Sequence, residues 1–157
     1  MRDFKYRAWL KPFVNYKGIT VQGEMYKVHS IHFGTKRVII TSKGYGNVSV
    51  EFDRIILEEF TELPDINGKE IYEGDIVTSW LYPFTYKDPF VTEKNYVGVV
   101  AWSEMNLAFY LEMFPISKRV RGSACGGLLA SYEAKKLEVI GNIHDNPELL
   151  EAPHDNA

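Results

Sequence analysis

The chain has almost no cysteine and no excess of positive charge, and both shortages restrict its function. Its 157 residues include one cysteine, Cys125, which cannot by itself form an internal disulfide or a cysteine-based zinc site. Eighteen lysine and arginine residues stand against 21 aspartate and glutamate residues, giving a formal charge of −3. Because phosphate neutralisation supplies most of the affinity of duplex-DNA binders, this balance disfavours a dedicated DNA-binding domain and leaves only a local basic patch open.

Long apolar runs are missing as well. No segment approaches the roughly 20 apolar residues that a membrane-spanning helix needs. The first residues, MRDFK, contain no apolar core of a secretory signal. We therefore expect a cytoplasmic protein without a membrane partner. The hydrophobic share of 45% and the charged share of 25% are those of an ordinary folded domain, which excludes disordered, collagen-like and coiled-coil chains.

Short apolar or alternating runs, separated by Gly, Pro, Asn and Asp, predict a mainly β protein. The expected strands cover residues 4–9, 19–21, 28–33, 37–41, 48–52, 76–81, 96–102, 108–114 and 137–143. Residues 43–47 (KGYGN) predict a hairpin turn. Residues 53–60 fit either a strand or a single helical turn. Asn146 suits a helix cap and Pro147 a first turn, so we expect a short helix over 146–151.

Two irregular stretches, 82–95 and 117–127, separate the later strands. Loops of this length in a compact domain are often functional. The candidate binding surface therefore consists of their aromatic and basic residues: Tyr82, Phe84, Tyr86, Phe90, Lys118, Arg119 and Arg121. Exposed aromatic rings would stack on bases or form a protein-binding groove, whereas rings folded inward would plug the mouth of a barrel. The basic residues would contact an anionic partner or belong to a solvated loop.

Carboxylates gather in residues 65–77, DINGKEIYEGDIV. A structural reading is favoured, because Gly74 tolerates a positive φ and Asp75 accepts hydrogen bonds from nearby backbone amides. The alternative is a metal or acid–base site that uses Asp65, Glu73 or Asp75, and it needs partners that the sequence does not supply.

No other catalytic, cofactor-binding or metal-binding set is predicted. His29 and His32 are three residues apart, which places them on opposite faces of a regular strand. Residues 122–127, GSACGG, resemble a phosphate loop only superficially, since two leucines follow where the Walker pattern requires Lys and then Ser or Thr. We expect this segment to be a loop without a phosphate-binding role.

Three segments, in order along the chain, carry a family resemblance. They are KYRAW at 5–9, DINGKEIYEGDIV at 65–77, and LEVIGNI at 137–143 followed by NPELL at 146–150. Together they resemble the YopX family of phage and prophage proteins, with matching order and spacing. Leu10 stands where that family usually carries Asp, and His144-Asp145 replace Tyr-Glu. The resemblance implies small β-rich domains related to SH3-type barrels, and it brings no established activity and no catalytic residues.

The expected architecture is therefore mainly β in three parts. They are an N-terminal β-subdomain over 1–62, an SH3-like barrel over 63–143, and a short C-terminal helix with a polar tail over 144–157. For function we expect a non-catalytic accessory protein, without a cofactor, that binds an unknown host or phage protein. The alternatives are a nucleic-acid-binding protein and a metal-dependent enzyme. Exposed strand edges would also allow a homo-oligomer.

Overall fold

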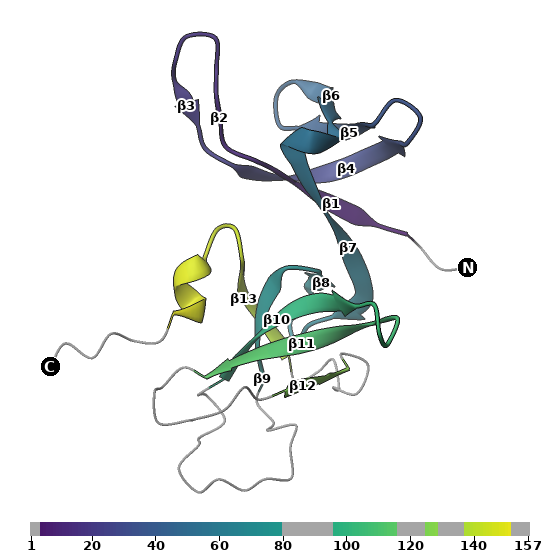
Figure 1. The fold of residues 1–157 in the computed structure, drawn as a ribbon, viewed down its shortest axis with the longest axis vertical. Coiled ribbons are helices and arrows are strands. Elements are labelled where there is room, and N and C mark those ends of the chain that lie inside the picture. Colours follow the sequence, from purple (N-terminus) through teal and green to yellow (C-terminus); the bar gives the residue numbers. More distant parts are fainter. Residues whose placement is uncertain (1–3, 80–95, 116–124, 129–136, 152–157) are drawn as a thin grey trace, which may run out of the picture. The chain divides into compact units, whose positions relative to one another are not determined.

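A computed structural model describes residues 4–79, 96–115, 125–128 and 137–151. Over these residues the chain is mainly β, which confirms the predicted class. The strands are β1 (Tyr6–Leu10), β2 (Phe13–Val14), β3 (Thr20–Val21), β4 (Glu24–His32), β5 (Arg37–Ser42), β6 (Gly46–Glu51), β7 (Ile55–Pro64), β8 (Glu70–Tyr72), β9 (Asp75–Ser79), β10 (Tyr96–Ser103), β11 (Ala108–Pro115), β12 (Cys125–Leu128) and β13 (Leu137–Asn142) (Figure 1). Two 3₁₀ turns, η1 (Phe52–Arg54) and η4 (Pro147–Leu150), accompany them.

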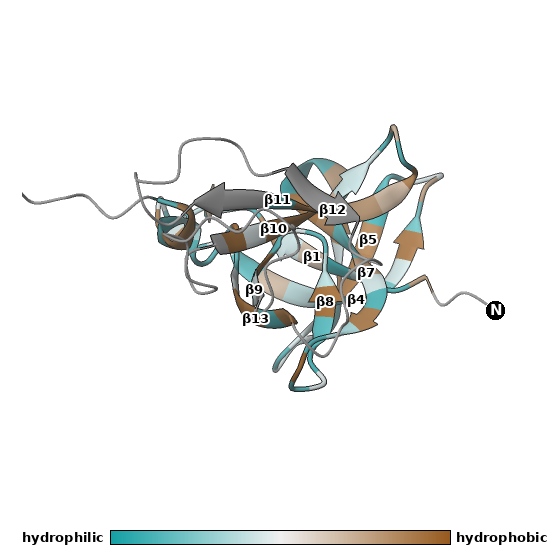
Figure 2. Cartoon of the chain, turned by 90° about the horizontal axis from the view of Figure 1, so that it is seen from below, coloured by the Kyte–Doolittle hydropathy of each residue, from teal (hydrophilic) through white to brown (hydrophobic). Residues whose placement is uncertain are grey.

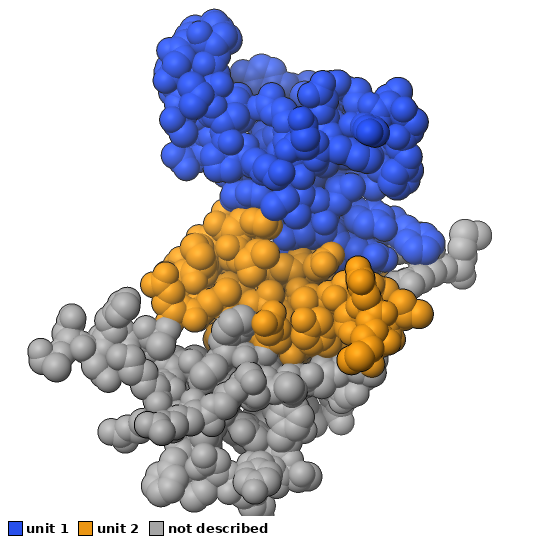
Figure 3. Space-filling view, viewed as in Figure 1, with its two compact units in different colours: residues 1–60 blue, residues 61–157 orange. Residues whose placement is uncertain are grey.

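The chain divides into two compact units, Met1–Phe60 and Thr61–Ala157, drawn in blue and orange in Figure 3. β7 belongs to the first unit as far as Phe60 and to the second from Thr61. None of the helical segments within the described ranges is long and apolar enough to cross a membrane.

Unit 1 is an antiparallel sheet with the strand order β6-β5-β4-β1-β7. Side chains alternate along its strands, so β5 buries Val38 and Ile40 while its intervening residues are less buried. Figure 2 shows hydrophobic (brown) and hydrophilic (teal) residues together on strands of this sheet such as β4. These two residues pack with Ala8 and Ile55 to form the core of the unit. Residues 53–60, for which the sequence left a strand or a helical turn open, contain both: η1 ends at Arg54 and β7 follows directly.

The β2–β3 hairpin is a separate two-stranded ribbon in unit 1 (Figure 1). The Asn15 side chain fixes its loop, since Oδ1 accepts hydrogen bonds of 3.0 Å from the backbone N–H groups of Lys17 and Ile19. Gly18 adopts the positive φ of 75° that this loop requires. At the tip, the Tyr16 side chain is 92% exposed.

Unit 2 contains a second antiparallel sheet, with the order β12-β11-β10-β9-β13. One face of β9 and β10 buries Val77 and Val100 against Ile71 and Leu137, among others. The other face carries Ile76, Val97 and Val99, and it is covered by Leu149 and Leu150 of η4. The C-terminal turn therefore completes the packing of this sheet.

Two predictions for the second half of the chain are not confirmed. The described strands of unit 2 form an open sheet, so the SH3-like barrel is not confirmed. The C-terminal helix is a single 3₁₀ turn, Pro147–Leu150. Its predicted cap, Asn146, makes no side-chain bond to that turn, because its Oδ1 accepts a hydrogen bond from the N–H of Asn142 at 3.3 Å. Extended backbone at Glu151 then ends the turn.

The glycine-rich segment 122–127 differs from the expected loop at its end. Residues from Cys125 onward form β12, which pairs with β11.

Candidate functional site

The seven predicted binding residues lie outside the described residues. Tyr82, Phe84, Tyr86 and Phe90 fall in 80–95, and the basic residues Lys118, Arg119 and Arg121 fall in 116–124. This binding surface stays a prediction. The candidate site described below rests on other residues.

Asp65 is a buried carboxylate whose partners are backbone N–H groups. Oδ1 accepts hydrogen bonds from Asn67 at 2.8 Å and Lys69 at 2.9 Å, and Oδ2 accepts one from Val139 at 3.0 Å. Burial alone would raise the pKa of this carboxyl, but the N–H groups of Val139, Lys69 and Asn67, with the Lys69 charge, lower it below the usual value. Asp65 thus ties the turn after β7 to β13, 74 residues away.

Asp75 has a similar role in the turn between β8 and β9. Its Oδ2 accepts a 2.8 Å hydrogen bond from the Tyr72 N–H, and the residue is only 1% exposed. The adjacent Gly74, at a φ of 81°, donates to the Val100 carbonyl and accepts from the Ile143 N–H. These contacts support the structural reading of the EGD segment.

His29 and His32 do not form a metal or catalytic site with other described residues. His29 and His32 are both exposed, and His32 Nε2 lies 2.9 Å from Ser30 Oγ. A bulge between Val28 and Ser30 interrupts the strand that carries them. Across the part of the chain that the structure describes, no three His, Cys, Asp or Glu side chains gather as a metal site would require.

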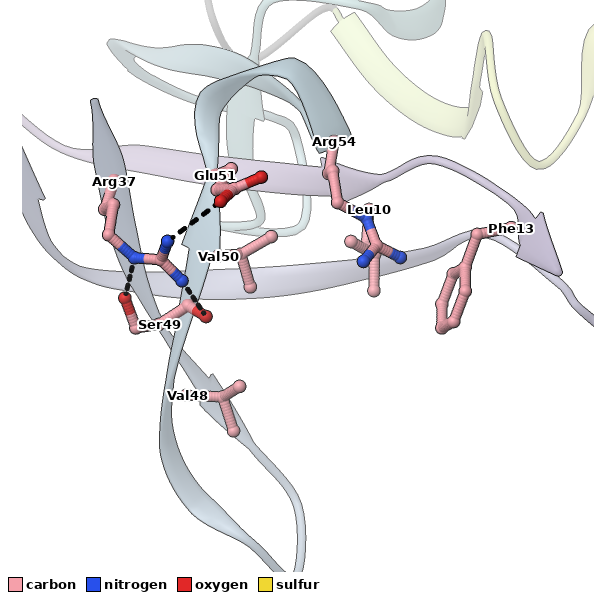
Figure 4. A pocket seen from close by; sticks show the side chains of 8 residues that line it. All are labelled: Leu10, Phe13, Arg37, Val48, Ser49, Val50, Glu51 and Arg54. Carbon is pink, nitrogen blue, oxygen red and sulfur yellow. Dashed lines mark hydrogen bonds and ion pairs between the residues drawn. The ribbon is translucent and has the colours of Figure 1, made fainter. Parts of the chain in front are cut away.

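The candidate site is a groove in unit 1, beside the edge strand β6. It has a volume of about 330 Å³ and is lined by Leu10, Phe13, Arg37, Val48, Ser49, Val50, Glu51 and Arg54. In Figure 4 the Val50 side chain lies between the guanidinium groups of Arg37 and Arg54, and Val48 lies further along the same strand. Ser49 is drawn on the Arg37 side of Val50, and Leu10 and the Phe13 ring are drawn on the Arg54 side. The groove therefore combines an apolar floor with cationic borders.

β6 is an edge strand beside the groove. One of its two sides pairs with β5, and no described strand pairs with the other side. The N–H of Phe52, just after β6, donates to the Lys36 carbonyl at 3.0 Å. Hydrogen-bonded pairs recur at every second residue of an antiparallel ladder. Val50 and Val48, which lie opposite Val38 and Ile40, are therefore the β6 residues whose backbone groups face β5.

Arg37 crosses from β5 to hold β6 from its polar side. Its Nε donates to Ser49 Oγ at 2.6 Å, Nη2 to the Ser49 carbonyl at 3.2 Å, and Nη1 to Glu51 Oε1 at 3.2 Å. The Arg37 and Glu51 side chains are 39% and 59% exposed, so water screens this ion pair. The charge of Arg37 is thus largely balanced by Glu51.

Arg54 differs from Arg37 because it has no carboxylate partner among the described residues. Its guanidinium carbon lies 4.3 Å from the centre of the Phe13 ring, a cation–π contact. Its backbone carbonyl accepts a 2.9 Å hydrogen bond from the Lys11 N–H, which fixes η1 against the end of β1. The arrangement presents an exposed cation at the border of an apolar groove.

Sequence reasoning missed this groove because its lining comes from three separated segments. Leu10 and Phe13 are far in the chain from Arg37 and from residues 48–54, and only the sheet brings them together. The alternation of Val48 and Val50 marks a strand face but does not mark a binding site.

The comparison with protein-family models agrees with the resemblance in the sequence. The family model described as YopX protein matches residues 5–151. The crystal structure of protein EF1440 from Enterococcus faecalis is similar to this chain, with 23% sequence identity, coverage of 96% of this chain and 100% of that chain, and a TM-score of 0.47. None of the curated proteins matches the sequence.

Proposed function

This chain belongs to the YopX protein family, and we propose that it is a non-catalytic protein-binding module. In this proposal it is an accessory protein of a phage or prophage that acts in the cytoplasm of a bacterial host. The family resemblance brings no catalytic residues. The buried carboxylates Asp65 and Asp75 accept hydrogen bonds from backbone N–H groups of unit 2, which favours a role in folding.

The groove beside β6 is the observation that carries this proposal. Its apolar floor accommodates side chains of a partner, and the edge strand offers backbone groups for pairing. Exposed apolar tips elsewhere are also typical of interaction surfaces: Tyr16 is 92% exposed, and Met105, in the turn between β10 and β11, is 89% exposed.

Site-specific photo-cross-linking in host cells tests this function. A photoreactive amino acid at position 48, in the groove, should give a discrete protein adduct. The same amino acid at position 104, an exposed site in unit 2, is the matched control. The adduct should be lost when the groove also carries Arg54→Glu. A chain that gives no adduct specific to position 48 would contradict the proposed role of the groove.

The nucleic-acid alternative depends on Lys118, Arg119 and Arg121 with the loop aromatics, all outside the described residues. Titration with single-stranded and double-stranded DNA at low salt tests it. If no salt-dependent binding is measured, this alternative is wrong.

The proposal also includes the SH3-like architecture of residues 63–143. We retain a relationship between the segment 63–143 and SH3-type barrels, supported by the antiparallel succession of β9, β10 and β11. A barrel would need further strand pairing to close the sheet. An experimental structure of the full chain would show that pairing or rule it out.

A further inference from the structure

We infer, resting on the proposed function, that the partner supplies an extended acidic segment that adds a strand to the open edge of β6. An apolar side chain of this segment lies against Leu10, Val48 and Val50. A carboxylate two residues away binds the Arg54 guanidinium. Three observations support this mode of binding: the backbone of β6, the apolar floor of the groove, and the charge at its border.

The backbone of β6 supplies the first observation. Since Val48 and Val50 use their backbone groups on β5, the N–H groups of Asn47, Ser49 and Glu51 point to the open side. β6 is the edge of its sheet, so no described strand pairs with it on the side to which these three N–H groups point. The Ser49 carbonyl on the same side accepts a bond from Arg37, so the donors are the groups most available to a partner.

The apolar floor determines the spacing expected in the partner. Alternate residues of an added strand point to the same face, so residues i and i+2 would both face the groove. Val48 and Val50 contribute to this floor, and Arg54 follows the strand at its end. An apolar residue beside the valines therefore places the residue two positions away near Arg54. A volume of about 330 Å³ is at the low end for ligand sites, which suits one or two side chains.

The charges around the groove favour an acidic partner. The basic residues of β5, η1 and the adjoining segments outnumber the acidic ones: Arg37, Arg54, Lys11 and Lys36 against Glu51 and Asp53. Glu51 is bound by Arg37, and the Lys11 ammonium donates to the Asp53 carbonyl at 2.9 Å. The local excess is therefore positive although the whole chain carries −3.

Selection of random peptides on the immobilised full-length chain tests the inference. Enriched peptides should carry an apolar residue and an Asp or Glu two positions apart, without proline between them. When bound, they should slow hydrogen exchange at the N–H groups of Asn47, Ser49 and Glu51. Arg54→Gln should weaken binding by about 3- to 10-fold, as for an ion pair that is partly exposed. Lys17→Gln, which removes a charge from the β2–β3 hairpin, is the matched control and should leave affinity unchanged.

A pair of substitutions at Ser49 separates strand addition from simple groove binding. Ser49→Pro removes the outward N–H, and proline is tolerated where an edge strand faces solvent. Ser49→Ala keeps that N–H and removes only the hydroxyl. We expect Ser49→Pro to weaken binding about 10-fold, equivalent to one lost hydrogen bond, and Ser49→Ala to change it by less than about 3-fold. Circular dichroism and thermal melting of both variants verify that they are folded.

The outcomes distinguish this inference from the proposed function. Peptides that lose affinity with Val48→Asp or Arg54→Gln, but bind Ser49→Pro normally, would overturn strand addition and leave a groove-binding module. Peptides insensitive to every groove substitution, or no enrichment at all, would overturn both. A dimer in sedimentation experiments, with the same three N–H groups already protected without peptide, would instead identify a second copy as the occupant and overturn the inference.

Discussion

Arg54 in unit 1 and Asp65 in unit 2 are charged residues directly before and directly after β7, yet their surroundings are opposite. Asp65 is 5% exposed and accepts three backbone N–H bonds from its own unit. Arg54 is exposed, rests on the Phe13 ring, and has no carboxylate partner among the residues that are described. The hydrogen-bonding capacity of Asp65 is used in folding, whereas that of Arg54 is available to another molecule.

The difference shows that the most conspicuous motif of a sequence need not mark its function. The segment DINGKEIYEGDIV is one of the three that carry the family resemblance, and its Asp65 and Asp75 hold together turns and strands of unit 2. Removal of such a group should cost stability. Removal of a groove residue should cost binding and little stability, and the following experiments test that division.

Asp65→Ala should give the largest effect. It leaves the N–H groups of Asn67, Lys69 and Val139 without their acceptor, and each buried group left unsatisfied costs about 1–3 kcal/mol. We expect a loss of about 3–5 kcal/mol in the free energy of unfolding, measured by urea denaturation. Asp53→Ala, at an exposed site in η1, should stay within about 0.5 kcal/mol. Equal losses in the two variants would contradict the role assigned to Asp65.

Acid should remove part of the same stabilisation. The pKa of Asp65 is lower in the folded protein than in the unfolded chain, where an aspartate titrates at about 3.9. The carboxylate therefore contributes its full stability above that value and loses it as the pH falls through the lower folded pKa. Urea midpoints between neutral pH and about pH 3 should fall more steeply for the wild type than for Asp65→Asn. Parallel curves would show that another group controls acid unfolding.

The β class and the first strands were predictable because alternation and turn residues are local signals. Residues 37–41 and 48–52, with the turn between them, correspond closely to β5 and β6. At the C-terminus the predicted short helix corresponds to a single 3₁₀ turn, Pro147–Leu150, and its expected cap does not form, because the Asn146 side chain accepts a hydrogen bond from the Asn142 N–H instead.

The groove could not be predicted in the same way. Its floor requires Leu10 to lie near Val48 and Val50, although β5 and β4 stand between β6 and β1 in the strand order, and no short pattern encodes that proximity. Whether Arg54 has an acidic partner is likewise a property of the folded chain. By contrast, the structural interpretation of Asp75 could be proposed from the sequence, since Gly74 and the short turn are local features, and the Asp75 contact with the Tyr72 N–H supports it.

Arg54→Gln tests whether a residue of the groove contributes less to stability than Asp65 does. Loss of the contact with the Phe13 ring should lower the free energy of unfolding by about 0.5–1 kcal/mol, far less than Asp65→Ala. Arg54→Lys retains the charge and should recover part of the loss. Thermal melting of the wild type, Arg54→Lys and Arg54→Gln should show stability decreasing in that order. A loss above about 2 kcal/mol for Arg54→Gln would mean that this arginine is primarily structural.

Glu51→Gln should have the smallest effect, because it tests an ion pair that is exposed on both sides. The Arg37 Nη1–Glu51 Oε1 distance is 3.2 Å, and pairs of this exposure contribute about 0.2–1 kcal/mol. Arg37 keeps its two bonds to Ser49 in the variant, so β6 should remain paired with β5. Salt at about 1 M should abolish the difference in unfolding free energy between the wild type and Glu51→Gln, since it screens exposed charges over a few ångströms.

The same variant also tests how Glu51 affects the binding of acidic peptides. If Glu51→Gln strengthens this binding, the negative charge of Glu51 normally limits how many acidic residues the groove accepts. An unchanged affinity would mean that Arg37 already neutralises it and that Arg54 alone selects the charge of the partner.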